Sequence, residues 1–284
     1  MAIKHDWKDK IVTISILLLC VATGLLDFIE ITYAKDAATN RLLQSLMPPL
    51  VGSIAVILLI IRGGAKIFGK PQNLWAMIPC LLIAVDNFPF ASYIGNQMQP
   101  LVYTQPIHFL LFLLNCIFVG VFEEIIFRGI FFALIAGCFS SDRKGFLKTY
   151  VISSVLFGAV HLLNVFFGGS IGATLLQAGY TVLTGGLFAF AFIKTKNILF
   201  AALTHGVYNF CGVLFTAEQG LGNGSVVFYL PNVIVMAVVS ILIGAFVIYK
   251  VWTYPETERV ELYSRLGFGV KPRNKEQNNP QKEE

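Results

Sequence analysis

Three ionisable side chains stand together in an apolar stretch of the chain, in the segment FEEIIFRG at residues 122–129. They are Glu123, Glu124 and Arg128. A charged side chain at the centre of a membrane helix costs about 2.5–3.5 kcal/mol on insertion scales, so such residues mark functional sites by default. Glu124 and Arg128 are spaced i, i+4, which puts acid and base on one helix face and predicts an ion pair.

Glu123 lies about 100° around the same helix from Glu124, so it need not share that ion pair. A carboxylate beside an already neutralised pair is suited to act as a general base. Two further i, i+4 motifs follow in the chain. Phe157 precedes His161 in FGAVH, and His205 precedes Asn209 in HGVYN.

The three motifs together supply the groups of a hydrolytic site, which are a base for water and donors for a developing oxyanion. The candidate catalytic residues are Glu123, Glu124, His161, His205 and Asn209. A structural explanation competes for each residue alone, because polar side chains also join membrane helices through hydrogen bonds of about 0.6 kcal/mol. Joining helices does not by itself explain three motifs of the same spacing.

Other polar residues of the apolar runs have simpler explanations. Asp86 and Asn87 lie beside Pro89, where structural hydrogen bonding is the favoured role, although a cavity-lining role stays open. His108 is expected at an interface, and Asp27 and Glu30 are expected to be solvated near the end of a span.

The composition excludes a soluble domain of ordinary kind. Of the 284 residues 56% are hydrophobic and 13% are charged, against about 25% charged in typical soluble domains. Apolar runs near 20 residues predict an all-α, polytopic helical bundle of about eight transmembrane helices. The predicted spans are 11–33, 42–61, 74–94, 107–139, 147–167, 171–193, 198–216 and 226–249. The fourth is too long for one straight crossing, so it should tilt, protrude or break near Gly120 or Gly129.

The basic residues are distributed unevenly between the loops. If the N-terminus lies inside, eighteen of the 21 basic residues fall in inner segments, and the outer loops hold only Lys35 and Arg41. The positive-inside rule therefore predicts a multi-pass protein of the cell membrane with both termini in the cytoplasm. The acidic residues after the first apolar run favour a retained span over a cleaved signal peptide.

Two regions follow from this pattern. Residues 1–250 form the transmembrane bundle, with a functional core at about 110–215, and residues 251–284 form a polar cytoplasmic tail that is partly disordered. The five cysteines lie in apolar runs without CxxC spacing, which indicates buried packing residues rather than disulfides.

The three motifs resemble those of the CPBP family, the CAAX-protease and bacteriocin-processing membrane peptidases, also called Abi proteins. The family pattern EExxxR, FxxxH and HxxxN appears here in order, as Glu123-Glu124 to Arg128, Phe157 to His161, and His205 to Asn209. The resemblance implies an intramembrane endopeptidase in which Glu123 activates water, while His161, His205 and Asn209 complete the site. The first three spans and the tail carry no family signature.

The resemblance leaves the cofactor and the substrate open. His161 and His205 with a glutamate would suffice as ligands of a catalytic zinc ion, and the same residues would also serve a metal-free mechanism. The expected partners are the lipid bilayer and a peptide or protein substrate in the membrane, such as a prenylated tail or a leader peptide, and no nucleic acid. The alternative is a non-enzymatic immunity or peptide-binding protein of the same fold.

Counting along straight helices from their inner ends gives each residue an expected depth. His161 should lie about 21 Å in, near Glu123, whereas His205 should lie only about 10 Å in. This count predicts that Asn209, rather than His205, reaches the level of Glu123.

Overall fold

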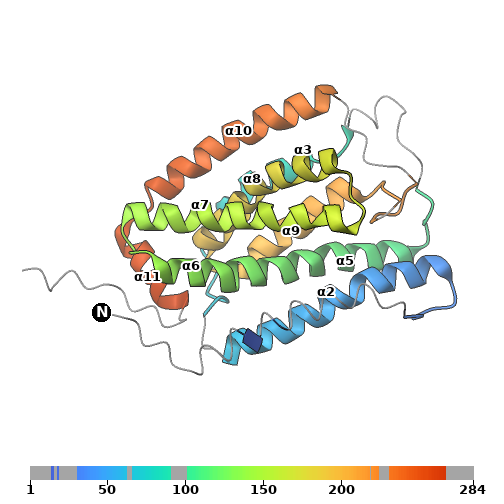
Figure 1. Cartoon of the computed structure of the whole chain (residues 1–284), viewed down its shortest axis with the longest axis horizontal. Helices are drawn as coiled ribbons and strands as arrows, with labels where there is room; N and C mark the ends of the chain where they lie inside the picture. Colours follow the sequence, from blue (N-terminus) through green and yellow to red (C-terminus); the bar gives the residue numbers. More distant parts are fainter. Residues whose placement is uncertain are drawn as a thin grey trace, which may run out of the picture.

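The computed structural model describes residues 14–15, 18, 31–62, 66–90, 101–217, 219–223 and 230–266. These residues are helical apart from short connections and one isolated bridge between Phe68 and Asn197, and they contain no sheet. The long helices run roughly side by side (Figure 1), which confirms the predicted all-α membrane bundle.

Each predicted span after the first coincides with a helix. The long apolar helices are α2 (Ala37–Arg62), α5 (Pro106–Glu124), α7 (Arg143–Val160), α8 (Ile171–Thr195) and α10 (Leu230–Trp252). Shorter ones are α3 (Ile78–Asp86), which follows the 3₁₀ turn η1 (Leu74–Met77), and α9 (Ile198–Val213). Within the described residues, five stretches are long and apolar enough to cross a membrane. The first predicted span, with Asp27 and Glu30, falls almost wholly outside the described residues.

The fourth predicted span is one continuous helical stretch of 33 residues, from Pro106 to Cys138. After Glu124 the α-helix changes to a π-helix, η2 (Ile125–Phe131), and then returns to an α-helix, α6 (Phe132–Cys138). Of the predicted alternatives of tilt, protrusion or a break near Gly120 or Gly129, the break is absent, and a π-helical segment that contains Gly129 is found instead. π-Helical segments are rare and are often found at functional sites.

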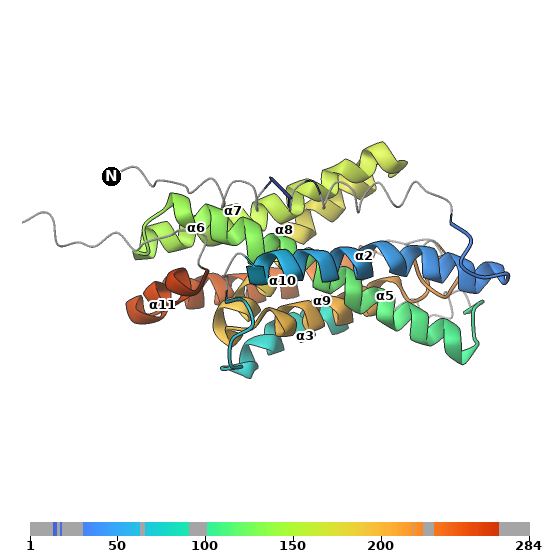
Figure 2. The same cartoon turned by 90° about the horizontal axis from the view of Figure 1, so that it is seen from below.

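The bundle has a buried centre and lipid-facing edges. α8 is the most buried of the long helices, while α10 is the least buried and lies at one edge with α2 at the other (Figure 1). The view turned by 90° places α7 and α3 on opposite sides of the bundle (Figure 2). The described core therefore centres on α8 and on the helices α5, α7 and α9 that carry the three motifs.

One end of the bundle is closed by a helix that the polar composition of the tail did not predict. Glu256–Leu266 form a helix, α11, which buries Leu262, Tyr263 and Leu266 against the bundle. The Tyr263 hydroxyl lies 3.0 Å from Thr149 Oγ1, and Arg259 Nε donates to Ser141 O at 3.0 Å. The last third of the predicted tail, where disorder was expected, lies outside the described residues.

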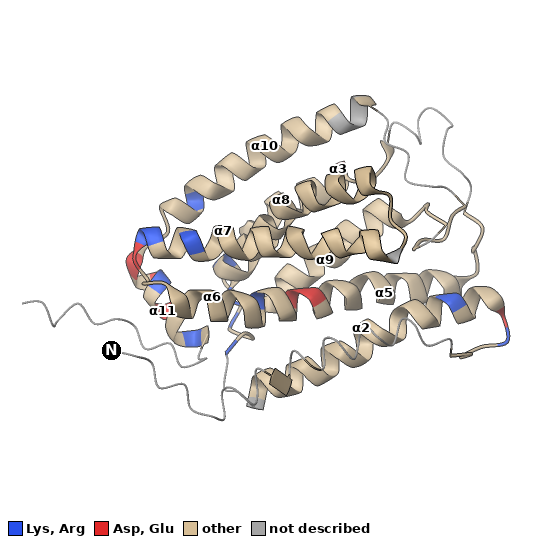
Figure 3. Cartoon of the chain, in the orientation of Figure 1, with Lys and Arg blue, Asp and Glu red and all other residues tan. Residues whose placement is uncertain are grey.

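The charged residues that the structure describes lie mainly at the two ends of the bundle, with one group midway along it (Figure 3). Lysine and arginine gather at the end that carries α11, and Glu124 and Arg128 lie midway along the α5–α6 stretch. At the opposite end, Arg41 donates to Gly220 O at 2.6 Å, which joins the start of α2 to the loop after α9. The two predicted outer loops therefore meet at the same end of the molecule.

Candidate functional site

The helices α5 and α9 approach closely because glycine stands at their contact. A Cβ atom on Gly120 would come within 2.7 Å of Ala202 O and 2.9 Å of Gly206 N, both backbone atoms. Gly206 in turn faces the backbone of Ile117 and Cys116. Small residues let membrane helices pack backbone to backbone. This contact lies one turn before Glu124 and next to His205, so it sets the distance between those two side chains.

The ion pair predicted from the spacing is present. Arg128 Nη1 donates to Glu124 Oε1 at 2.9 Å, and both side chains are 0% exposed. Arg128 Nη2 also donates to Gly185 O at 2.5 Å, and its guanidinium carbon lies 4.5 Å from the centre of the Phe157 ring. A carboxylate, a carbonyl and an aromatic face thus surround a cation that cannot lose its proton.

The contact between α7 and α8 also depends on glycine, which sequence reasoning missed. A Cβ atom on Gly185 would come within 2.7 Å of Phe157 Cδ1, and one on Gly158 would meet Ala178 O at 2.7 Å. The consecutive Gly185 and Gly186 in an otherwise apolar helix were a usable signal for close helix packing. These glycines bring the Phe157 ring and the Gly185 carbonyl to Arg128.

His205 bridges the two glutamates. Its Nδ1 lies 2.9 Å from Glu124 Oε1, and its Nε2 lies 3.7 Å from Glu123 Oε2. An ionised carboxylate can only accept, so Nδ1 carries the proton in this contact. The imidazole also stacks on the Phe188 ring, with centroids 4.4 Å apart. His205 is therefore held by a carboxylate and an aromatic face, with Nε2 directed at Glu123.

The expected depths of His205 and Asn209 are wrong. His205, and not Asn209, lies at the glutamates, while Asn209 is half-buried one turn further along α9 and makes no hydrogen bond to a described residue. The depth estimate from the sequence assumed that the helices all begin at the same depth in the membrane. Figure 1 shows α6 and α7 extending further toward α11 than α9 does, so α9 begins deeper in the bundle.

Glu123 and Glu124 are neighbours in sequence but differ in environment. The Glu123 side chain is 27% exposed, whereas that of Glu124 is 0% exposed. Oε2 of each glutamate is buried and accepts no hydrogen bond from a described residue, so the difference lies in exposure and in the contact of Glu124 with Arg128. His205 Nε2 lies 3.7 Å from Glu123 Oε2, a distance too long for a hydrogen bond. Glu123 is thus the carboxylate of the pair that is open to a ligand.

His161 lies on the same aromatic wall. Its Nδ1 lies 2.8 Å from Phe157 O, so Nδ1 donates and the neutral ring keeps a lone pair on Nε2. The Phe157 ring centre is 5.0 Å from that of His161 and 5.8 Å from that of His205. His161 is partly exposed at the point where α7 becomes the 3₁₀ helix η3 (His161–Phe167). Both histidines therefore contact the same phenyl ring.

The residues do not fit a catalytic zinc site as they are arranged. Such a site needs three protein ligands around one point. In the part of the chain that the structure describes, no group of three or more His, Cys, Asp or Glu side chains is placed to hold a metal ion. His205 Nδ1 already donates to Glu124, so only its Nε2 is available to a metal ion.

The remaining polar residues of the apolar runs lie outside this cluster. Asn87 donates to Tyr208 O at 3.2 Å, which ties the end of α3 to α9. Asp86 Oδ2 is buried without a described hydrogen-bond partner. His108 lies 3.7 Å from the exposed Asp36, near the start of α5, in agreement with the expected position near a span end.

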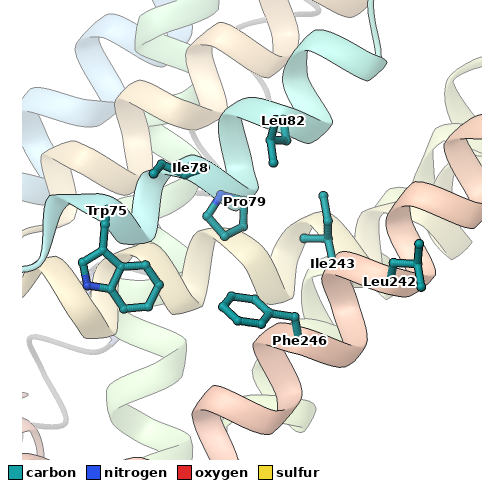
Figure 4. Close-up of a pocket in the computed structure, with 7 residues that line it drawn as sticks. All are labelled: Trp75, Ile78, Pro79, Leu82, Leu242, Ile243 and Phe246. Atoms are coloured by element: carbon teal, nitrogen blue, oxygen red, sulfur yellow. The ribbon is translucent and has the colours of Figure 1, made fainter.

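A pocket of about 300 Å³ lies between α3 and α10 (Figure 4). Apolar side chains line it, among them Trp75, Pro79 and Phe246. They offer no base, nucleophile or metal ligand, so this pocket is distinct from the polar cluster. Among the residues discussed, the groups suited to catalysis are therefore those of the polar cluster: Glu123, Glu124, Arg128, His161 and His205.

Comparison with protein families identifies the segment that carries the three motifs. Residues 105–211 match the family model described as type II CAAX prenyl endopeptidase Rce1-like. The matched segment begins at the residue that precedes α5 and ends within α9, after Asn209. Comparisons with the curated proteins and with the solved structures found no match. The family match confirms the resemblance to the CPBP intramembrane peptidases.

Proposed function

We propose that this chain, whose residues 105–211 belong to the Rce1-like family of CPBP intramembrane peptidases, hydrolyses a peptide bond of a membrane-associated substrate. The family is one of proteases, and the helical bundle is a multi-pass membrane protein. The observation that carries the proposal is the environment of Glu123. It is a partly exposed carboxylate, not committed to Arg128, next to a histidine that Glu124 holds in place.

In the proposed reaction Glu123 takes a proton from water as the water attacks the scissile carbonyl. His205 Nε2 faces the same space, 3.7 Å from Glu123 Oε2, and can receive that proton for delivery to the leaving amine. Glu124 supports this role because its contact with Nδ1 fixes the ring orientation and stabilises the imidazolium. Glu124 and Arg128 thus position the His205 ring, and Glu123 and His205 transfer the proton.

The developing oxyanion needs donors, and two candidates lie near the cluster. Asn209 has an amide N–H that is a donor at any pH, on the same face of α9 as His205. His161 can donate from Nε2 only when its ring is protonated, because Nδ1 already donates to Phe157 O. We therefore assign the oxyanion contact to Asn209 and a substrate-facing role to His161.

A zinc route is the second form of the mechanism. In that form His161 and His205 would supply two of the ligands of the ion. The route requires a third protein ligand to approach the two histidines. Chelation separates the two forms. Full turnover after chelation supports the metal-free route, and inhibition that zinc reverses supports ligation by His161 and His205.

The proposed substrate class rests on the description of the matched family and on the position of the cluster. CAAX prenyl endopeptidases act on prenylated peptides, and a site between α5, α7 and α9 lies within the bilayer span. A prenylated or leader peptide anchored in the membrane is therefore the proposed substrate.

The end that carries α11 is proposed to face the cytoplasm of the cell membrane, since the basic residues gather there. Cysteine-accessibility labelling on intact cells tests this orientation. A cysteine introduced at the exposed Lys144 should resist an impermeant reagent, and one at the exposed Asn223, in the loop after α9, should react. Ready labelling at position 144 would reverse the orientation.

The test of the function is cleavage of a peptide substrate by the reconstituted protein. Asn209→Ala should reduce turnover by about 10²–10³, the usual cost of losing one oxyanion donor. Asn40→Ala serves as a control, because the Asn40 side chain accepts from Tyr33 N and Ala34 N at the start of α2, away from the cluster. Equal turnover in both variants would remove Asn209 from the site. Absence of cleavage by the unmodified protein on prenylated and leader peptides alike would favour the binding-protein alternative.

A further inference from the structure

A second pocket, polar and of about 470 Å³, opens at the basic end of the bundle. It lies where the segment 66–72, between α2 and η1, meets α11. Its lining comprises Lys66, Phe68, Gly69, Lys70, Gln72, Glu261 and Arg265. The backbone of this segment is fixed, because Gly69 N donates to Lys196 O at 3.0 Å and Gln72 N donates to Thr195 O at 3.1 Å.

The charges of this pocket do not cancel. Lys66, Lys70 and Arg265 contribute three positive charges to its lining. The carboxylate of the lining, Glu261, accepts from Lys196 Nζ at 2.6 Å, so a fourth cation already neutralises it. The pocket therefore carries an excess of positive charge that favours an anionic ligand.

Arg265 is held in position for such a ligand. Its Nη2 donates to Lys196 O at 2.8 Å and to Lys66 O at 3.2 Å. Gly69 permits this arrangement, because a Cβ atom at that position would collide with the guanidinium. Nε and Nη1 make no hydrogen bond to a described residue, and a planar guanidinium with free donors suits a phosphate.

The pocket lies at the level where the membrane spans end. α2 ends at Arg62, α8 at Thr195 and α10 at Trp252, whose ring packs under the Arg143 guanidinium. Aromatic residues with basic neighbours are typical of the membrane–water interface. Phe68 stands 38% exposed in the lining and provides an apolar contact beside the cations.

We propose that this pocket binds the phosphate headgroup of an anionic membrane lipid. Lys66, Lys70 and Arg265 contact the phosphate, and Phe68 lies against the glycerol and the upper part of the acyl chains. Basic pockets between membrane helices at an inner surface are suited to such headgroups. The site is distinct from the glutamate cluster, and the proposal does not depend on peptidase activity.

The experiment measures the melting temperature of the full-length protein, purified in neutral detergent, during titration with phosphatidylglycerol. The unaltered protein should be stabilised in a saturable manner, and phosphatidylcholine should not reproduce the effect. Replacing both exposed lysines, in Lys66→Gln/Lys70→Gln, should weaken the apparent affinity roughly 10- to 30-fold, at about 1 kcal/mol for each lysine.

The matched control removes two lysines of the same end outside the pocket, in Lys144→Gln/Lys148→Gln. It should leave the affinity within about 2-fold. An equal loss in both double variants would show diffuse attraction to a basic surface and would overturn the proposal. Equal stabilisation by inorganic phosphate would also overturn it, because the ligand would then be free phosphate and not a lipid.

Discussion

Two ion pairs of this protein have similar geometry and opposite surroundings. Glu124 and Arg128 lie 2.9 Å apart with both side chains 0% exposed, in the middle of the bundle. Lys196 and Glu261 lie 2.6 Å apart at the basic end, where the Glu261 side chain is 48% exposed. The shorter contact, between Lys196 and Glu261, is the one whose carboxylate can also be hydrated by water. Distance alone therefore does not tell which pair the fold depends on.

The difference lies in what remains when one partner is removed. Without Glu124 or Arg128, an uncompensated charge stays buried, at a cost of about 3–5 kcal/mol. Without Glu261, Lys196 keeps an 8% exposed side chain at the end of the bundle, and a pair with one water-accessible partner contributes about 1 kcal/mol, less than a fully buried one. The buried pair also places His205, while the exposed pair joins α11 to the turn between α8 and α9. The Glu124–Arg128 pair thus helps to position the candidate site, whereas the Lys196–Glu261 pair holds α11 against the end of the bundle.

The largest effect on stability is expected from Arg128→Ala. Glu124 would lose its cation inside the bundle, and the free energy of unfolding should fall by about 3–5 kcal/mol, with poor yield of folded protein. Thermal unfolding in detergent measures this. The control Arg143→Ala removes an exposed arginine and should stay within about 0.5 kcal/mol. A normal melting temperature for Arg128→Ala would mean that the buried pair is not structural.

A smaller loss is expected from Gly120→Ala. The new methyl group would meet the backbone of Ala202 and Gly206, so α5 and α9 must separate, at a cost of about 1–3 kcal/mol. The separation should also lower turnover, because it moves His205 away from the glutamates. Gly179→Ala is the matched control on α8, where a Cβ atom meets no described atom within 4 Å. If both variants unfold at the same temperature, the close contact does not set the site.

The smallest effect concerns the exposed pair and its dependence on pH. The hydrogen bond from Lys196 lowers the pKa of Glu261 below its ordinary value of 4.5. A lowered pKa in the folded state contributes stability above the ordinary value, and this contribution disappears as the pH falls through the lowered pKa. Glu261→Gln should therefore cost less than about 1 kcal/mol at pH 7.

Comparing unfolding at pH 7 with unfolding near pH 3 checks the sign of this effect. The difference between Glu261→Gln and the unaltered protein should shrink at the lower pH. A difference that grows in acid would contradict the assigned ion pair.

The sequence was sufficient for the apolar helices and for the local pairs within them. The i, i+4 spacing of Glu124 and Arg128 determines their contact within one helical stretch, and apolar runs determine where the helices lie. The level of His205 could not be predicted, because it depends on where α9 begins relative to α6 and α7. That relation comes from the contact of Gly120 with Gly206, which no periodicity reveals.

The helix α11 was missed for a different reason. Its polar composition suggested a tail, yet Leu262, Tyr263 and Leu266 follow the spacing of one buried helix face. That signal was available in the sequence. The π-helical segment after Glu124 had no such signal beyond Gly129, because the widened turn depends on packing against neighbouring helices.

The central claim is a division of labour between Glu123 and Glu124, and matched Gln substitutions test it most directly. Glu123→Gln keeps the volume but cannot accept a proton from water, so turnover on a reconstituted substrate should fall by about 10²–10⁴. Its melting temperature should stay near that of the unaltered protein, because a neutral amide is easier to bury than a carboxylate. Glu124→Gln should instead lose folded protein, since Arg128 is left unpaired. Unaltered turnover in Glu123→Gln, with normal folding, would contradict the account.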